Sequence, residues 1–308
     1  MKLILYVQQE WPHRKNLEAI QRMCQKTAIE LEISHDLERL KQANYEILVS
    51  CHQYIDPSQI PNKIKIVYGP HFFIFPEGPI VGNIQPELQE RCVYNSLSTW
   101  VRNLYLECVP SLVMPIVSLP FGVDTDRFCP YPAIYDPIFD CTVYIKRRSN
   151  TIVQYALNIL QSKNMNYHIF QYGSYKEEDY MYGIRMSKFM LVLDAHESQG
   201  FALQEAMSCN VPLLVVNAET MYEETNDGVH STYEHMKPRL LQSTSVPYWS
   251  EECGMKITEK EKLSQAMDQM MTQYKSFTPR AYILRTLSDE VCMKRILNYF
   301  GLEKSLLV

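Results

Sequence analysis

The 308-residue chain contains no CxxC pair, and its nine cysteines are odd in number. Neither a zinc knuckle nor a secreted disulfide framework is therefore predicted, and reduced thiols in a reducing compartment are the simpler interpretation. No apolar run reaches the roughly 18 residues that a membrane-crossing helix needs. The short apolar start at residues 1–7 breaks at Gln8-Gln9-Glu10, too early for a secretory signal. We expect a cytoplasmic protein without a transmembrane segment, which leaves peripheral contact with a membrane open.

Excess positive charge is also lacking, because 30 Lys and Arg stand against 35 Asp and Glu, a net charge of −5. This balance offers no general attraction to a polyphosphate, so a nucleic-acid partner is not predicted, although a local basic cluster can still bind one diphosphate. Internal repeats and low-complexity segments are absent as well. With 46% apolar and 21% charged residues, the chain has the composition of a globular protein with one large or two medium domains.

Short apolar runs alternate with segments of helical periodicity along the chain. This alternation predicts an α/β fold of parallel sheets with helices on both faces, in which ligands bind beyond the carboxyl ends of the strands. We expect strands at Leu3–Val7, Glu46–Cys51, Ile64–Tyr68, Met114–Ser118, Cys141–Ile145, Tyr167–Tyr172, Phe189–Leu193 and Val211–Val216. We expect helices at Leu17–Glu30, Asn95–Leu106, Thr151–Gln161, Tyr180–Met186, Phe201–Ser208, Glu259–Tyr274 and, after a break at Pro279, Ser288–Phe300.

Four prolines, at positions 120, 130, 132 and 137, make the stretch from 118 to 137 a poor helix and a plausible connector. The expected organisation is a domain over residues 1–117, a second domain over 118–285 and a helical segment over 286–308.

One segment combines a strand, a turn and a helix. Phe189–Asp194 has the pattern of a buried strand, Ala195–Gln199 that of a polar turn, and Gly200–Ser208 helical spacing. The free amides and the dipole of a helix that begins at such a turn favour a bound phosphate. Gly200 permits close approach of a ligand to the backbone because glycine has no Cβ atom. The sequence therefore predicts an anion site at this turn.

Two glutamates accompany this turn and helix. Glu197 lies in the turn and Glu205 lies eight positions further on, about two helical turns along. Both can face one ligand, with Glu197 nearer its reacting end. The alternative is structural: Glu197 starts the helix, where a carboxylate is favoured, and Glu205 lies on a solvated face.

The run from Glu197 to Val215 resembles the E-x7-E signature of the retaining glycosyltransferases of GT-B fold, the large family-4 group. The residues that match are both glutamates, Gly200, Ala206, Met207 and Pro212. Ser198 and Gln199 stand where the family has Gly and Phe, a departure that bears on the choice of donor and leaves the acidic pair intact.

A second block, Leu119–Phe128, is similar to the P-N-G-V-D-x-x-x-F linker that enters the donor domain in this family. Asp124-Thr125-Asp126 also forms a DxD, the metal-binding signature of the other glycosyltransferase architecture. The flanking Gly122-Val123 and Arg127-Phe128 favour the linker, so no metal is implied.

The resemblance implies a GT-B fold: two Rossmann-like domains that face a cleft, with a reduced N-terminal domain. It assigns acceptor binding to residues 1–117 and donor binding to residues 118–285, with the helix of 286–308 packing back on the N-terminal domain. The implied donor is a UDP- or GDP-sugar and the implied acceptor is a glycan or another hydroxyl compound. No cofactor is implied.

In the family, the first glutamate contacts the donor sugar and the second contacts the ribose, which assigns these roles to Glu197 and Glu205. Lys146-Arg147-Arg148 are expected to hold the donor diphosphate. The family's usual R-x4-K spacing is absent here, and a solvated basic turn is the alternative. The remaining candidates are Phe201 and Ala202 beside Gly200, Gly173 and Ser174 beside the base, His196 beside Glu197, and His71 as a catalytic residue at the cleft edge.

The family's glycine-rich loop after the first strand is missing, since residues 8–12 contain no glycine. The resemblance implies that the leaving diphosphate accepts the proton of the acceptor, so the two glutamates are not the acid and base of a glycoside hydrolase. Two alternatives are a nucleotide-sugar epimerase of GT-B fold and a non-catalytic sugar-nucleotide-binding module, which the missing loop favours. A phosphorylase would normally be much larger.

Overall fold

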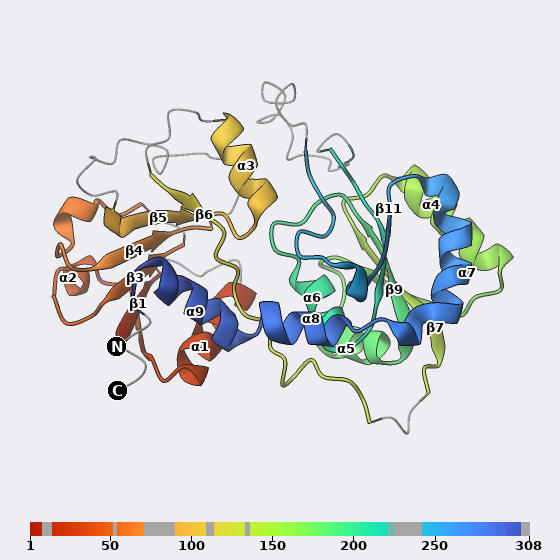
Figure 1. Ribbon diagram of the computed structural model, residues 1–308, viewed down its shortest axis with the longest axis horizontal. Coiled ribbons are helices and arrows are strands. Elements are labelled where there is room, and N and C mark those ends of the chain that lie inside the picture. The colour runs from red at the N-terminus through yellow and green to blue at the C-terminus, as the bar shows by residue number, and fades with distance from the viewer. Residues whose placement is uncertain are drawn as a thin grey trace. The chain divides into compact units, whose positions relative to one another are not determined.

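The computed structural model describes residues 1–7, 14–51, 54–70, 90–108, 114–132, 136–220, 223 and 242–302. The chain forms two compact units: Met1–Gly122 together with Leu287–Val308, and Val123–Thr286. Each unit is built on one parallel sheet with helices packed on it (Figure 1). The chain first passes from one unit to the other after Gly122, within the stretch 118–137 that the prolines marked as a connector.

The first unit has a six-stranded sheet in the order β2-β1-β3-β4-β5-β6, with every pair parallel. Its strands are β1 (Lys2–Tyr6), β2 (Glu30–Ser34), β3 (Ile47–Ser50), β4 (Lys65–Tyr68), β5 (Cys92–Asn95) and β6 (Ile116–Val117). Its helices are α1 (Arg14–Lys26), α2 (Leu37–Leu40), α3 (Thr99–Cys108) and α9 (Asp289–Tyr299). Helix α9 packs against α1, so the end of the described chain belongs to this unit.

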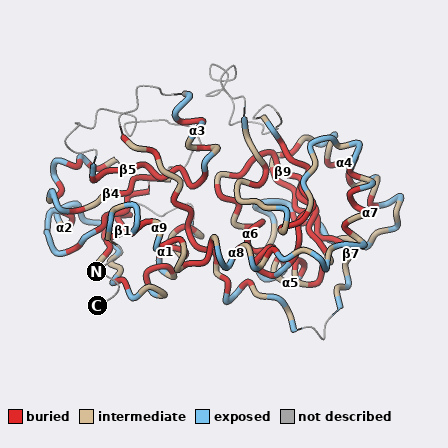
Figure 2. Tube along the Cα trace, viewed as in Figure 1, coloured by how far each residue is buried: buried red, intermediate tan, exposed pale blue. Residues whose placement is uncertain are grey.

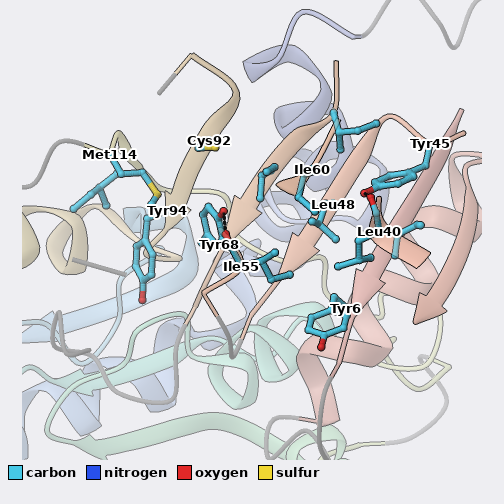
Figure 3. Packing of buried hydrophobic residues seen from close by; sticks show 14 of the residues in the cluster. Tyr6, Leu40, Tyr45, Leu48, Ile55, Ile60, Tyr68, Cys92, Tyr94 and Met114 are labelled. Atoms are coloured by element: carbon cyan, nitrogen blue, oxygen red, sulfur yellow. Dashed lines mark hydrogen bonds between the residues drawn. The ribbon is translucent and has the colours of Figure 1, made fainter. Parts of the chain in front are cut away.

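One face of this sheet carries a core rich in tyrosine, shown in Figure 3. The buried tyrosine hydroxyls have partners, because an unpaired polar group would be costly there. Tyr45 donates to the carbonyl of Leu40 and Tyr68 donates to that of Ile55, both over 2.6 Å. The first bond joins the end of α2 to the segment before β3, and the second ties the loop after β3 to the end of β4.

The second unit has a five-stranded parallel sheet in the order β11-β10-β9-β7-β8. Its strands are β7 (Phe139–Lys146), β8 (Tyr167–Gln171), β9 (Ser187–Asp194), β10 (Leu213–Val216) and β11 (Gly254–Ile257). Its helices are α4 (Asn150–Ser162), α5 (Glu177–Arg185), α6 (Phe201–Ser208), α7 (Leu263–Gln273) and α8 (Pro279–Thr286). After β7 the chain adds β8 on one side and β9 on the other. The strand order therefore reverses between β7 and β9.

The two faces of β7 and β9 carry different residues. Val143, Leu191 and their odd-numbered neighbours pack against α4 and α7 in one apolar cluster. Tyr144, on the opposite face, packs edge-on against Tyr180 of α5, with ring centroids 6.4 Å apart. Both strands are buried almost throughout, as Figure 2 shows. Lys146 and Asp194, at even positions, follow Tyr144 on the face of α5.

The expected α/β fold is confirmed, but several element boundaries are wrong. Helix α1 ends at Lys26, because Ala28 has a left-handed φ of 56°, and Glu30 begins the unexpected edge strand β2. Asn95 closes β5 instead of opening a helix. Its side chain binds both the amide and the carbonyl of Leu119, which holds it at the end of the sheet.

Two elements of the second unit are absent from the sequence prediction. Strand β11 is short and follows a stretch without an apolar run. The sequence predicts a break in helical structure at Pro279, yet Pro279 is the first residue of α8, where its missing N–H removes no helical hydrogen bond. Among the described residues, no helix combines the length and apolar character needed to cross a bilayer.

Candidate functional site

The candidate site lies at the carboxyl ends of β7 and β9, where the strand order reverses. Ligands of open parallel sheets bind at such a reversal, because the connections leave it in opposite directions and open a crevice. The last residues of the two strands, Lys146 and Asp194, are paired in the sheet register, and a further bridge joins Arg147 to Asp194. The topology therefore brings a basic and an acidic residue together at this point.

Lys146 and Glu197 form a buried ion pair at this site. The Lys146 Nζ lies 2.5 Å from Glu197 Oε1, and the two side chains are only 11% and 9% exposed. Burial disfavours the charged ammonium, but the neighbouring negative charge, first of all that of Glu197, outweighs burial and raises the pKa of Lys146. The ring of Tyr172, which is 48% exposed, lies with its centroid 4.5 Å from the same ammonium. Lys146 is therefore a charged group held by a carboxylate and an aromatic face.

The three basic residues differ in their surroundings. Arg148 is buried, and its Nη2 lies 2.9 Å from a Glu223 carboxylate oxygen and 3.4 Å from the carbonyl of Asn217. Burial lowers the pKa of Arg148, and Glu223 partly offsets this effect. Arg147 is half-buried and has a left-handed φ of 53°. Because Lys146 and Arg148 are buried, a solvated basic turn does not describe this segment.

Gly200 is the N-cap of α6 and has a left-handed φ of 83°. A Cβ atom there would meet Glu197 at 3.4 Å, an ordinary contact, so the backbone angle and not a lack of space requires glycine. The turn is also fixed by two glutamines: Gln199 donates to the Gln204 side chain over 3.1 Å, and Gln204 donates to the Gln199 carbonyl over 2.7 Å. Sequence reasoning noted Gln199 only as a departure from the family.

Helix α6 is buried from Ala202 to Ser208. Glu205 is 4% exposed, so the alternative that it lies on a solvated face is wrong. The pKa values of Tyr175 and Tyr180 are raised, mainly by burial and next by the negative charge of Glu205. The Tyr180 hydroxyl donates to the carbonyl of Ala202, which joins α5 to the start of α6.

A polar network behind the site was not anticipated from the sequence. Ser245 Oγ donates to the carbonyl of Asp194 over 2.7 Å and accepts from the amide of Ala218 over 2.8 Å. The Asn217 side chain accepts from the Ser245 amide over 3.1 Å, and the Glu197 amide donates to the carbonyl of Thr244 over 3.1 Å. No local pattern in the sequence marks these residues, which come from segments about 50 positions apart.

The remaining predicted site residues lie in different surroundings. Gly173, with a φ of 76°, and Ser174 form an exposed turn after β8, next to Tyr172. His196 is buried beside Glu197, and Phe201 is the half-buried first residue of α6. His71 lies outside the described residues, as does most of the loop after β1.

The DxD sequence forms a turn. The Asp124 side chain accepts from the amide of Arg127 over 3.0 Å, and the Asp124 carbonyl accepts from the amide of Phe128 over 2.9 Å. In the part of the chain that the structure describes, no cluster of three or more His, Cys, Asp and Glu side chains is arranged as metal ligands.

Models of known protein families give no match to this chain, and no curated protein matches it. Solved structures do match. AviGT4, a glycosyltransferase involved in avilamycin A biosynthesis, gives a TM-score of 0.58 at 13% identity, with 99% of this chain and 98% of AviGT4 covered. The lipopolysaccharide outer core galactosyltransferase WaaB gives 0.55 at 11% identity, with coverage of 98% and 99%. The catalytic domain of starch synthase IV from Arabidopsis thaliana gives 0.59 at 7% identity, with 99% of both chains covered.

Two parallel-sheet units that match these structures over nearly the whole chain define the GT-B fold. The fold expected from the sequence is thus confirmed. At these identities the likeness concerns the fold, and the activity of this chain has to be argued from its own residues.

Proposed function

We propose that this protein is a glycosyltransferase that moves a sugar from a nucleoside-diphosphate sugar to a hydroxyl group of a glycan or similar acceptor. We further propose that the reaction retains the anomeric configuration and needs no metal ion. The GT-B fold shared with glycosyltransferases supports transfer, and the buried cations of the second unit support a metal-free diphosphate site. The described cysteine side chains are free, which fits a reducing, cytoplasmic location.

The observation that carries the proposal is the buried Lys146–Glu197 pair, with Arg148 beside it, at the reversal of strand order. Cations held in a water-poor site can stabilise the charge that develops on a leaving diphosphate. In our proposal, Lys146, Arg148 and the first amides of α6, at Phe201 and Ala202, provide this stabilisation. A half-buried Arg147 contributes less.

Glu197 and Glu205 then have separate tasks. Glu197, next to Lys146, orients the sugar, and Glu205, further along α6, binds the ribose. The exposed Tyr172-Gly173-Ser174 turn lies beside the base of a UDP or GDP moiety. The starch synthase IV domain was solved bound to ADP and acarbose, a pair of ligands of the kind proposed here. The diphosphate itself accepts the acceptor proton, and His71 remains a prediction for the acceptor side.

The test is to titrate UDP-, GDP- and ADP-sugars and follow release of the nucleoside diphosphate with and without glycan acceptors, by NMR. We expect acceptor-dependent release, product with the donor's anomeric configuration, and no change on adding EDTA. Glu197→Gln should bind the donor and lose turnover, whereas Glu259→Gln, in an exposed pair with Lys262, should behave as wild type.

Each contrary outcome identifies a different function. Binding with no release for any acceptor indicates a sugar-nucleotide-binding module, and release of an altered free sugar without acceptor indicates an epimerase. An inverted product refutes retention, and loss of turnover in EDTA refutes metal independence. Full turnover in Glu197→Gln refutes the role of that carboxylate.

A further inference from the structure

Asp194, the last residue of β9, has an unusual environment for a carboxyl group. It is completely buried, at 0% exposure, and no described residue donates a hydrogen bond to either of its carboxyl oxygens. The neighbouring amide of Ala195 donates to the carbonyl of Lys146. An ionised carboxylate without donors is costly in such a place, whereas the protonated acid is neutral and can itself donate.

The charges around Asp194 favour the same protonation state. The ionisable groups that interact with it are Glu197, Lys146, Arg148 and Tyr144. Burial, followed by Glu197, raises the pKa of Asp194 well above its usual range, whereas Lys146 and the adjacent amide of Ala195 oppose this. The two cations already have carboxylate partners, because Lys146 pairs with Glu197 and Arg148 pairs with Glu223. A further negative charge at Asp194 is not needed to compensate them.

We propose that Asp194 is a positioning residue that keeps a proton and donates it in a hydrogen bond to Glu197, so that Lys146 can turn from Glu197 to the donor diphosphate. This inference rests on the proposed function, since it requires a diphosphate beside Lys146. The proton keeps a hydrogen bond on the Glu197 carboxylate when the ammonium moves to the ligand. An ionised Asp194 would place one more buried negative charge next to an anionic ligand.

Two substitutions distinguish a protonated from an ionised Asp194. Asparagine has the shape of the protonated acid and also donates a hydrogen bond, but it never becomes negative. Alanine has no donor. If Asp194 is protonated, Asp194→Asn preserves the hydrogen bond to Glu197 and Asp194→Ala removes it. If Asp194 is ionised, Asp194→Asn removes a charge that repels the ligand.

The first experiment measures binding of inorganic pyrophosphate and UDP by titration calorimetry from about pH 6 to about pH 9. At neutral pH we expect Asp194→Asn to bind within about threefold of wild type, and Asp194→Ala to bind about 10-fold more weakly, a loss of about 1.4 kcal/mol. Wherever Asp194 ionises on the alkaline side, the affinity of wild type should fall, and Asp194→Asn should lack this fall. Binding of Asp194→Asn that is about 10-fold tighter than wild type at neutral pH would overturn the proposal, as would unchanged binding of Asp194→Ala.

A second measurement needs no variant of the site to fold. Infrared spectra of wild-type protein labelled with carbon-13 aspartate should show a protonated carboxyl band at neutral pH, which shifts when pyrophosphate binds. Asp140→Asn is the matched control. Burial raises the pKa of Asp140, but hydrogen bonds from Lys188 over 2.7 Å and from the amide of Asn166 over 2.9 Å, with the charge of Lys188, together outweigh burial and lower it, so this change should leave the band intact. A wild-type spectrum without the band overturns the inference.

The outcomes separate this inference from the proposed function. If wild type binds none of pyrophosphate, UDP and GDP, then the donor site itself is refuted, and with it the movement of Lys146. If wild type binds them but the Asp194 variants or the infrared band give the contrary result, only the role of Asp194 is refuted.

Discussion

Replacing Lys146 by methionine tests the central contact of the site. Methionine keeps most of the side-chain volume and removes the ammonium whose Nζ lies 2.5 Å from Glu197. A hydrogen bond between a charged donor and its acceptor contributes about 1.5–3 kcal/mol, so losing one such bond to a diphosphate weakens binding about 10- to 150-fold. The affinity of Lys146→Met for UDP and pyrophosphate should fall within this range.

The same change also affects stability. Breaking a fully buried ion pair costs about 3–5 kcal/mol because an uncompensated charge is left behind. Here both side chains keep about a tenth of their surface exposed, so water reaches the remaining carboxylate and the cost is smaller. We expect Lys146→Met to destabilise the second unit by about 1–3 kcal/mol. Urea unfolding of wild type and Lys146→Met measures this cost.

Two variants serve as controls for Lys146→Met. Lys163 pairs with Asp268 over 2.7 Å at a more exposed place in the same unit, so Lys163→Met should cost at most about 1 kcal/mol and leave UDP affinity unchanged. Arg147→Met tests the half-buried neighbour and should weaken binding less than about threefold, or about 0.7 kcal/mol. The reasoning is refuted if Lys146→Met binds UDP as wild type does, or if Arg147→Met has the larger effect.

Three further predictions concern the rest of the chain. Arg147 has a left-handed φ of 53°, which glycine adopts more easily than alanine. Arg147→Gly should therefore be about 1 kcal/mol more stable in urea unfolding than Arg147→Ala. The reverse order would contradict backbone strain at this position. Arg91 is buried and donates to four backbone carbonyls of residues 57–64. Arg91→Met should therefore lower the free energy of unfolding by about 3 kcal/mol, whereas the change of the exposed Lys63 to Met should lower it by less than about 0.5 kcal/mol. Equal losses would refute a specific role of Arg91. Hydrogen bonds from Arg39 and then Lys2 lower the pKa of Glu32 from 4.5 to about 2, so its stabilisation is present above about pH 4.5 and is lost toward pH 2. The Tm advantage of wild type over Glu32→Gln should shrink across this window, and a constant difference would contradict the linkage.

How far the fold is predictable depends on the kind of strand. β7 and β9 are buried on both faces, and their continuous apolar runs are visible in the sequence. Among the described strands, β2 lies at the edge of its sheet and pairs with β1 alone, and its sequence Glu-Leu-Glu-Ile-Ser is as polar as the helix before it. An edge strand of this kind is identified by its neighbour in space, which local periodicity does not report. The same applies to β11 beside β10.

Some residues of the candidate site can be predicted from the sequence, and others cannot. Glu197, Gly200 and Glu205 lie within one strand-turn-helix segment, so a motif can represent them. Ser245 and Asn217 hold this segment from other parts of the chain, and only the fold brings them to it. Asp194 was visible as a charged residue at the end of an apolar strand, but its lack of donors depends on burial by surrounding elements.

The basic cluster shows why a missing motif need not mean a missing function. The family pattern separates its two cations by four residues, whereas here the two buried cations, Lys146 and Arg148, are separated by one. In an extended strand, alternate residues share a face, and the left-handed Arg147 between them ends β7. Their partners differ, since Lys146 meets Glu197 on the turn before α6 and Arg148 meets Asn217 and Glu223 beyond β10. If a diphosphate binds here as we propose, two cations fixed from two separate segments would hold it.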